Sequence, residues 1–142
     1  MRTRGFIDLV IRGIGLCNDE ISTRLDMTPN RFNKKGDTHK DKYTNKTTIY
    51  SEDSWYAGIE IKQGESPEDA LTRFVDILHP HSDYIKSLST SFDVILWLSL
   101  YPDDEQMNVH LSPSMISRIC DMCISIDVSA MFLKQIYERD TD

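Results

Sequence analysis

Two cysteines near the end of the chain have a spacing that zinc and redox sites use. Cys120 and Cys123 form a Cys-X-X-Cys pair, which is found in both kinds of site. A structural zinc site needs four ligands, but the only further cysteine is Cys17, and there is no second pair. Both cysteines also fall on the apolar stripe of an expected helix. We therefore expect buried, free thiols and no bound zinc.

Histidines are the next residue type that could do chemistry. His79 and His81 flank Pro80, and two imidazoles in one turn could bind a metal or exchange protons near neutral pH. No carboxylates with a matching spacing accompany them, so the simpler interpretation is a surface turn that ends a helix. His110 is most simply a partly covered residue of an edge strand. We predict no metal site and no cofactor.

Three aspartates stand inside three different expected strands among mostly apolar neighbours: Asp8, Asp93 and Asp127. If these strands are adjacent and in register, the carboxylates could gather on one face of a sheet. Like charges would then raise a pKa or hold a divalent cation. The register is not visible in a sequence. A solvated sheet face, an acidic patch for a basic partner, and a catalytic or metal cluster therefore all stay open.

Motifs of the common enzyme classes are missing from the sequence. It contains no GxGxxG, no GxxxxGK[ST], no HExxH and no nucleophile motif, and its six glycines never group into a phosphate-binding loop. We therefore expect a protein that is not an enzyme.

Hydrophobic periodicity indicates the elements that would position these residues. Period-two alternation predicts strands at 6–14, 55–62 and 124–132. A run that is apolar on both faces predicts a central strand at 92–101, and a short strand is expected at 107–111. Asn18 is expected to cap a short helix that ends before Pro29, and Ser66-Pro67 and Ser112-Pro113 are expected to start two more. A further short helix is expected at 82–88. Phe74 and Leu78 should be fully buried against the sheet.

The order of these elements favours an α+β fold. We expect a two-layer sandwich in which an antiparallel or mixed sheet has its helices packed on one face. The 142 residues suffice for a single domain, with a core at about 4–133 and a charged tail at 134–142. Within the core range, residues 31–53 lack a hydrophobic pattern and are rich in lysine. We therefore expect a long loop there that is either functional or a solvated hairpin tip.

Composition and charge limit the possible partners. Hydrophobic residues make up 39% and charged residues 27% of the chain, which is typical of a soluble globular protein. No apolar run is long enough to span a membrane, and no secretory signal is visible. We therefore expect a cytoplasmic protein without a membrane partner. The formal charge of −7 disfavours nucleic acid as a partner.

A series of short motifs resembles one bacterial family. The motifs are Asn18-Asp-Glu-Ile21, Leu25 with Thr28-Pro29, Lys35-Gly36-Asp37, Ser54-Trp55, Ile77-Leu78 before Pro80, and Ser125-Ile-Asp127. Their order, from about Arg4 to Phe132, is similar to that of the domain of unknown function 4279 family. A departure is the lengthened, lysine-rich stretch between Asp37 and Ser54. The resemblance implies a small soluble bacterial protein of a kind often encoded near toxins, and it defines no functional residues.

These observations together predict a non-enzymatic binding protein, most concretely an immunity protein that neutralises a cognate bacterial toxin. An acidic chain suits a basic partner such as a nuclease-type toxin. We expect the interface at the acidic turn Asp103, Asp104 and Glu105 together with Asp127, and hold Lys34 and Lys35 in reserve for an acidic partner. A small metal-dependent enzyme and a regulatory ligand-binding domain are the alternatives. The protein is expected to be a monomer or a small homo-oligomer.

Overall fold

The computed structural model describes residues 4–102 and 108–131. In chain order its elements are β1 (Gly5–Gly13), α1 (Asn18–Leu25), β2 (Arg31–Asn33), β3 (Thr38–Lys40), β4 (Thr47–Ile49), β5 (Asp53–Glu60), α2 (Pro67–Leu78), a single 3-10 turn (His79–His81), α3 (Ser82–Leu88), β6 (Asp93–Leu100), α4 (Pro113–Asp121) and β7 (Ser125–Ala130). Within this part of the chain, no helix is long and apolar enough to cross a membrane.

Five strands form one mixed sheet in the order β2-β5-β1-β6-β7. Strand β1 pairs antiparallel with both β5 and β6, and β2 pairs antiparallel with β5. Strand β7 runs parallel to β6, because the chain crosses over through α4 between these two strands. The expected sheet is therefore confirmed, and it is of the mixed kind.

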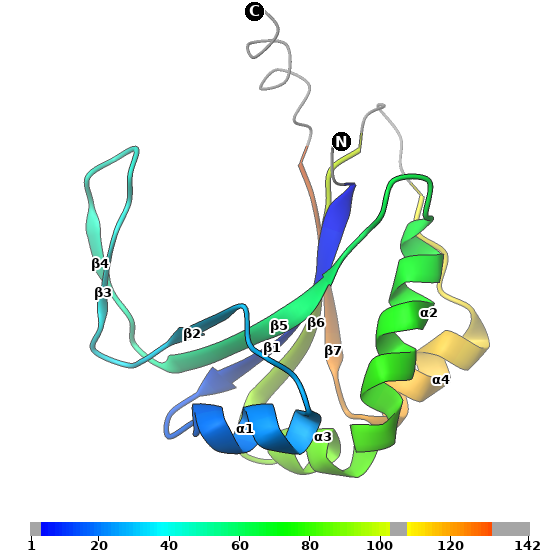
Figure 1. The fold of residues 1–142 in the computed structure, drawn as a ribbon, viewed down its shortest axis with the longest axis horizontal. Helices are drawn as coiled ribbons and strands as arrows, with labels where there is room; N and C mark the ends of the chain where they lie inside the picture. The colour runs from blue at the N-terminus through cyan, green and yellow to red at the C-terminus, as the bar shows by residue number, and fades with distance from the viewer. Residues whose placement is uncertain (1–3, 103–107, 132–142) are drawn as a thin grey trace, which may run out of the picture.

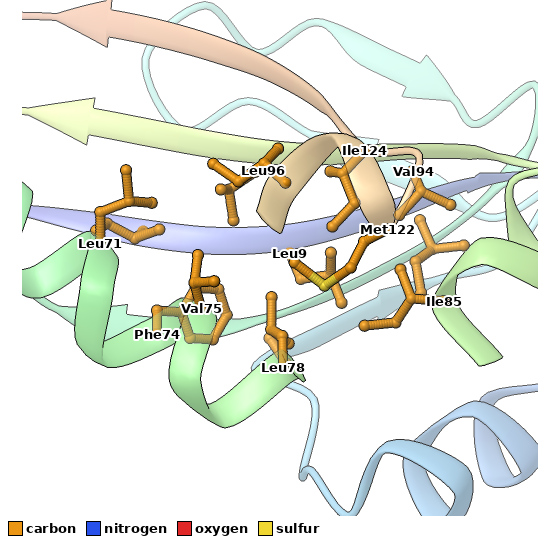
Figure 2. Packing of buried hydrophobic residues seen from close by; sticks show 14 of the residues in the cluster. Leu9, Leu71, Phe74, Val75, Leu78, Ile85, Val94, Leu96, Met122 and Ile124 are labelled. Carbon is orange, nitrogen blue, oxygen red and sulfur yellow. The ribbon is translucent and has the colours of Figure 1, made fainter. Parts of the chain in front are cut away.

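The helices α2, α3 and α4 pack on the same face of this sheet and α1 lies at its end, giving the predicted two-layer α+β sandwich (Figure 1). Side chains from α2 and α3 meet Leu9 and Leu96 of the two central strands, and Met122 and Ile124 follow from the turn after α4 (Figure 2). Phe74 and Leu78 are both 0% exposed, as expected. The alternation of apolar residues in β1 explains why the helices pack on this face of the sheet, because Ile7, Leu9 and Ile11 all point into the core.

Both Ser-Pro helix starts form as predicted. The Ser66 hydroxyl accepts a hydrogen bond from the Asp69 N–H at 3.1 Å, and Ser112 accepts one from the Met115 N–H at 3.2 Å. Each bond satisfies one of the free N–H groups in a first helical turn. Asn18 does not cap α1, since its side-chain oxygen accepts instead from Ser22 Oγ at 3.0 Å. That helix ends at Leu25, before the expected Thr28-Pro29, with Asp26 in the left-handed region (φ 51°).

The segment 31–53 is more ordered than a long loop. Its first residues form the edge strand β2, and the antiparallel pair β3 and β4 forms a separate hairpin, which we call the arm. The arm extends away from the sheet on the side opposite the helices (Figure 1). Its strands show no hydrophobic pattern because both are exposed along their whole length. The structure thus shows an exposed hairpin in this segment.

The buried stripe of α4 differs from the predicted one. Met115, Ile119 and Met122 are buried, whereas Cys120 and Cys123 are exposed, so the prediction of buried cysteines was wrong. The helix ends at Asp121 and Cys123 takes a positive φ of 55°. Cys123 therefore lies beyond the end of the helix, and Cys120 lies on its exposed side. All three cysteines are free.

The strand expected at 107–111 does not form at the described residues 108–111. This stretch belongs to the crossover toward α4, and its His110 N–H donates to Glu68 Oε1 at 2.6 Å. The backbone therefore bonds to a side chain at the start of α2 and not to a neighbouring strand. Residue 107 and the acidic turn Asp103, Asp104 and Glu105 lie outside the described residues.

Candidate binding site on the uncovered sheet face

One face of the sheet carries no helix among the described elements (Figure 1). Residues directly opposite each other on neighbouring strands share a face, so the register identifies which side chains lie there. We call this surface the open face. Across β2, β5, β1, β6 and β7 it presents Arg31, Tyr56, Gly58, Glu60, Phe6, Asp8, Val10, Arg12, Asp93, Ile95, Trp97, Ser99, Ser125, Asp127 and Ser129.

The centre of the open face is a hollow of about 330 Å³. Val10, only 1% exposed, is its most deeply buried lining residue. The aromatic side chains in its lining come from three neighbouring strands: Phe6, Tyr56 and Trp97. The polar part of the lining consists of Asp8, Asn30, Arg31 and Ser99. The hollow thus combines apolar surface with a few polar groups, as binding sites commonly do.

Asp8 is the acidic group in the lining of this hollow. It lies directly opposite Gly58 of β5, and a Cβ at position 58 would collide with the Ile7 carbonyl oxygen and with Asp8 Oδ1. The absence of a side chain at Gly58 therefore makes room for this carboxylate. Burial raises the pKa of the Asp8 carboxyl above its ordinary value. No described residue donates a hydrogen bond to it.

Trp97 is the direct neighbour of Asp8 on the other side, across the β1–β6 pair. Its indole Nε1 is buried and has no hydrogen-bond partner in the described part of the chain. The Arg12 guanidinium lies over the ring, 5.4 Å from its centroid, a distance at which a cation is attracted to the π-face. An unpartnered buried donor is uncommon in a folded protein and costs stability.

Arg31 is held at the rim of the hollow by two neighbours. Its guanidinium lies 4.7 Å from the ring centroid of Tyr56. When the Asn33 carboxamide is oriented with its oxygen toward Arg31, this oxygen accepts hydrogen bonds from Arg31 Nε at 3.0 Å and from Arg31 Nη2 at 3.1 Å. These contacts restrict the rotation of the Arg31 side chain, so the rim of the hollow has a defined shape.

The three strand aspartates do share the open face, but they do not form a cluster. Asp8 and Asp127 flank Trp97 from either side, whereas Asp93 lies opposite Arg12, four residues along β6 from Trp97. Within residues 4–102 and 108–131, no three His, Cys, Asp or Glu side chains are placed to hold a metal ion. The arrangement is therefore that of single carboxylates on a mixed surface.

The sequence-predicted interface residues fall at opposite edges of the sheet. Asp127 is exposed on the edge strand β7, while Lys34 and Lys35 are exposed directly after the other edge strand, β2. The Lys35 N–H donates to Asp53 Oδ1 at 2.8 Å, which fixes the start of the arm to β5. The acidic and the basic candidate surfaces are thus separate.

A second, open hollow of about 470 Å³ lies on the helical side. It brings His79 together with Cys120, which are 41 positions apart in the sequence, between Asp83, Lys86 and Asp121. His81, the other half of the predicted histidine turn, is not part of its lining. The sequence placed the two candidate groups in separate motifs, because only the packing of α4 beside the 3-10 turn brings them close.

The residues around Asp8 were largely missed by sequence reasoning. The sequence motifs single out none of Tyr56, Trp97, Gly58 and Arg31 as functional residues. Only the period-two pattern was informative, since it placed Tyr56 on the face opposite the buried Trp55.

The fold and this surface define the class of protein: a small α+β domain with one helix-covered and one uncovered sheet face. A family model described as a domain of unknown function (DUF4279) matches residues 4–133, and the chain belongs to this family. The predicted resemblance is thereby confirmed over nearly its whole length. No curated protein matches the chain, and no solved structure matches it.

Proposed function

We propose that the chain is a non-enzymatic protein-binding domain that neutralises a cognate bacterial toxin by direct binding. The observation that carries the proposal is the open face, which displays Trp97, Tyr56, Phe6, Arg12 and Arg31. Trp, Tyr and Arg are the residue types that dominate the binding energy of protein interfaces.

The charge of the chain supports a basic partner. The formal net charge is −7, and the open face itself carries Asp8, Glu60, Asp93 and Asp127 against Arg12 and Arg31. Such a field attracts a basic protein over a distance and speeds its association. A nuclease-type toxin, which must itself be attracted to nucleic acid, has the complementary charge.

A regulatory ligand-binding domain is the second candidate, and the hollow favours it. At about 330 Å³ its volume lies at the lower end of the range for small-molecule sites, roughly 300 to 1,000 Å³. An open hollow on a wide uncovered face is, however, also the shape into which one side chain of a protein partner inserts.

The test begins with capture of a partner from a bacterial host and its identification by mass spectrometry. The purified partner is then titrated against the parent and two charge-reversal pairs that change the net charge by the same amount. Glu60→Lys with Asp127→Lys alters the open face, and Asp83→Lys with Asp121→Lys alters the helical side. All four positions are solvent-exposed. We expect the open-face pair to weaken binding by about tenfold or more and the helical pair to leave it unchanged.

Growth provides the second readout. Expression of the partner alone should stop the growth of a bacterial cell, and co-expression of the parent chain should restore it. The open-face pair should restore growth poorly, and the helical pair should restore it fully. A partner that is harmless on its own, or binding that responds equally to both pairs, would contradict the proposal.

A further inference from the structure

The hollow on the open face contains a carboxylate that the protein itself leaves without compensation. Asp8 is half-buried, accepts no hydrogen bond from any described residue and takes part in no ion pair there. Burying a carboxylate without a partner is costly. Its Oδ1 occupies the space that a side chain at the neighbouring Gly58 would need, so the fold makes room for the carboxylate without giving it a partner.

The two arginines of the open face do not supply the missing charge. Arg31 is engaged with Tyr56 and with the Asn33 carboxamide, and Arg12 lies over the Trp97 ring. Burial is the cause that acts on the Asp8 carboxyl, and neither guanidinium lowers its pKa. A cation from outside the chain would therefore meet a carboxylate that is still unpaired.

The lining around Asp8 favours a particular kind of cation. Phe6, Tyr56 and Trp97 line the hollow, and aromatic rings attract ammonium and guanidinium groups through their π-faces. The methylene stem of a long basic side chain can pack on the same apolar rings, because Val10 between them is almost wholly covered. A bare metal ion would gain little here, because it needs several oxygen ligands.

We propose that this hollow binds a lysine or arginine side chain of the protein partner, with its charged end at Asp8 and its stem along the aromatic side chains. This inference rests on the proposed function and names the group that the open face recognises. Carboxylate and cation then compensate each other inside a partly desolvated site, where a charge pair is stronger than on an exposed surface.

The test uses the two tryptophans of the chain as reporters in an NMR titration. Trp97 lines the hollow, whereas the Trp55 indole donates to Ser22 Oγ at 3.1 Å on the helical side. Their indole N–H signals are assigned with Trp97→Phe. The probes are the N-acetyl methylamides of lysine, arginine, norleucine and glutamate. We expect saturable shifts of the Trp97 signal with lysine or arginine only, while the Trp55 signal stays in place.

Three variants decide what causes such a shift. Asp8→Asn keeps the shape and removes the charge, and it should weaken probe binding by about tenfold or more in a protein at least as stable as the parent. Asp93→Asn makes the same change on the exposed part of the same face, outside the hollow, and should bind like the parent. Arg31→Gln removes a like charge from the rim and should strengthen binding of the basic probes.

Two results would overturn the inference. The first is no saturable shift with either basic probe, and the second is an equal effect of Asp8→Asn and Asp93→Asn. Preferential binding of the glutamate probe, lost in Arg31→Gln, would show an anion site in its place. The proposed function is refuted by different results: the captured partner does not stop growth, or it binds the open-face charge-reversal pair as tightly as the parent. A toxin that binds the parent and Asp8→Asn equally well would leave that function standing and refute only the hollow as its anchor.

Discussion

Asp53 joins three parts of the chain through one carboxylate. It is the first residue of β5 and only 7% exposed. Its Oδ1 accepts the Lys35 N–H at 2.8 Å, and its Oδ2 accepts the Gly15 and Leu16 N–H groups at 2.9 and 3.1 Å. The hydrogen bond from Lys35, followed by those from Gly15 and Leu16, holds the pKa of this carboxyl below its ordinary value. These bonds connect the end of β1 and the start of the arm to the sheet.

Asp53→Asn should lower the free energy of unfolding by about 1 to 3 kcal/mol at pH 7, because a charged acceptor of three N–H groups is replaced by a neutral one. The folded-state pKa is depressed, so this contribution is full above the unfolded-state pKa of about 3.9. It is lost as the pH falls through the lower folded-state pKa. Urea unfolding of parent and variant should therefore converge as the pH drops below about 4. Asp127→Asn, at an exposed position, should change stability by less than about 0.5 kcal/mol. A constant gap between parent and Asp53→Asn at every pH would contradict this role.

Helix α2 is the element that holds the two layers together. Phe74 is 0% exposed, and Ile77, one turn further on the same helix, is 43% exposed. Phe74→Ala should cost about 3 to 5 kcal/mol of unfolding free energy, because it removes a large side chain from the core and leaves a cavity. Ile77→Ala serves as the matched control. Its expected cost is below about 1 kcal/mol, because much of the Ile77 side chain is exposed to solvent and little buried apolar area is lost. Equal losses in urea titrations of the two variants would mean that the buried face of α2 is assigned wrongly.

Elements with a strong local signal could be predicted from the sequence. The Ser66-Pro67 start and the buried stripe through Phe74 and Leu78 are set by neighbours within one helix, and the strand β1 by alternation within nine residues. The strands of the arm could not be located from the sequence, because they are exposed on both faces and carry no hydrophobic period. The cysteines were misplaced because the end of α4, marked by the positive φ of Cys123, has no Gly or Pro to announce it.

The candidate site depends on pairing between distant strands, which no local pattern contains. Asp8 meets Gly58 and Trp97 only because β1 pairs with both β5 and β6 in one particular register. A shift by one residue would place Asp8 on the core face. The sequence could thus name Asp8 and Asp127 as strand aspartates but could not show that Trp97 lies between them.

At the scale of the whole molecule, the two layers and the arm have separate tasks. The helical layer buries the core, and the open face lies on the other side of the sheet (Figure 1). The arm contributes nothing to the buried hydrophobic cluster, and Tyr43 at its tip is 97% exposed. Its base is closed by two backbone hydrogen bonds, from Gly36 N–H to the Tyr50 oxygen and from Tyr50 N–H to the Asp37 oxygen, both 2.9 Å long.

Removal of the arm should therefore leave the domain folded. Replacing residues 38–49 with Asn-Gly turns Asp37 and Tyr50 into the ends of a two-residue hairpin, and the bond from Tyr50 N–H to the Asp37 oxygen becomes its closing bond. We expect the free energy of unfolding to stay within about 1 kcal/mol of the parent, because no core contact is lost and loop closure becomes slightly easier. A loss of several kcal/mol in urea unfolding would show that the arm stabilises the sheet.

The same variant distinguishes an interface on the open face from one on the lysine-rich segment, because the two predict opposite changes in the association rate. The deletion takes away three lysines and one aspartate, so the formal charge moves from −7 to −9, while the open face keeps all its residues. A basic partner that binds this face should then associate faster with the armless chain at low salt, and the gain should vanish at high salt. Stopped-flow association rates at two ionic strengths measure this. Slower association or lost affinity would place the interface on the lysine-rich segment 31–53, which keeps the reserve residues Lys34 and Lys35 but loses its other three lysines in this variant, and would require a partner of acidic character.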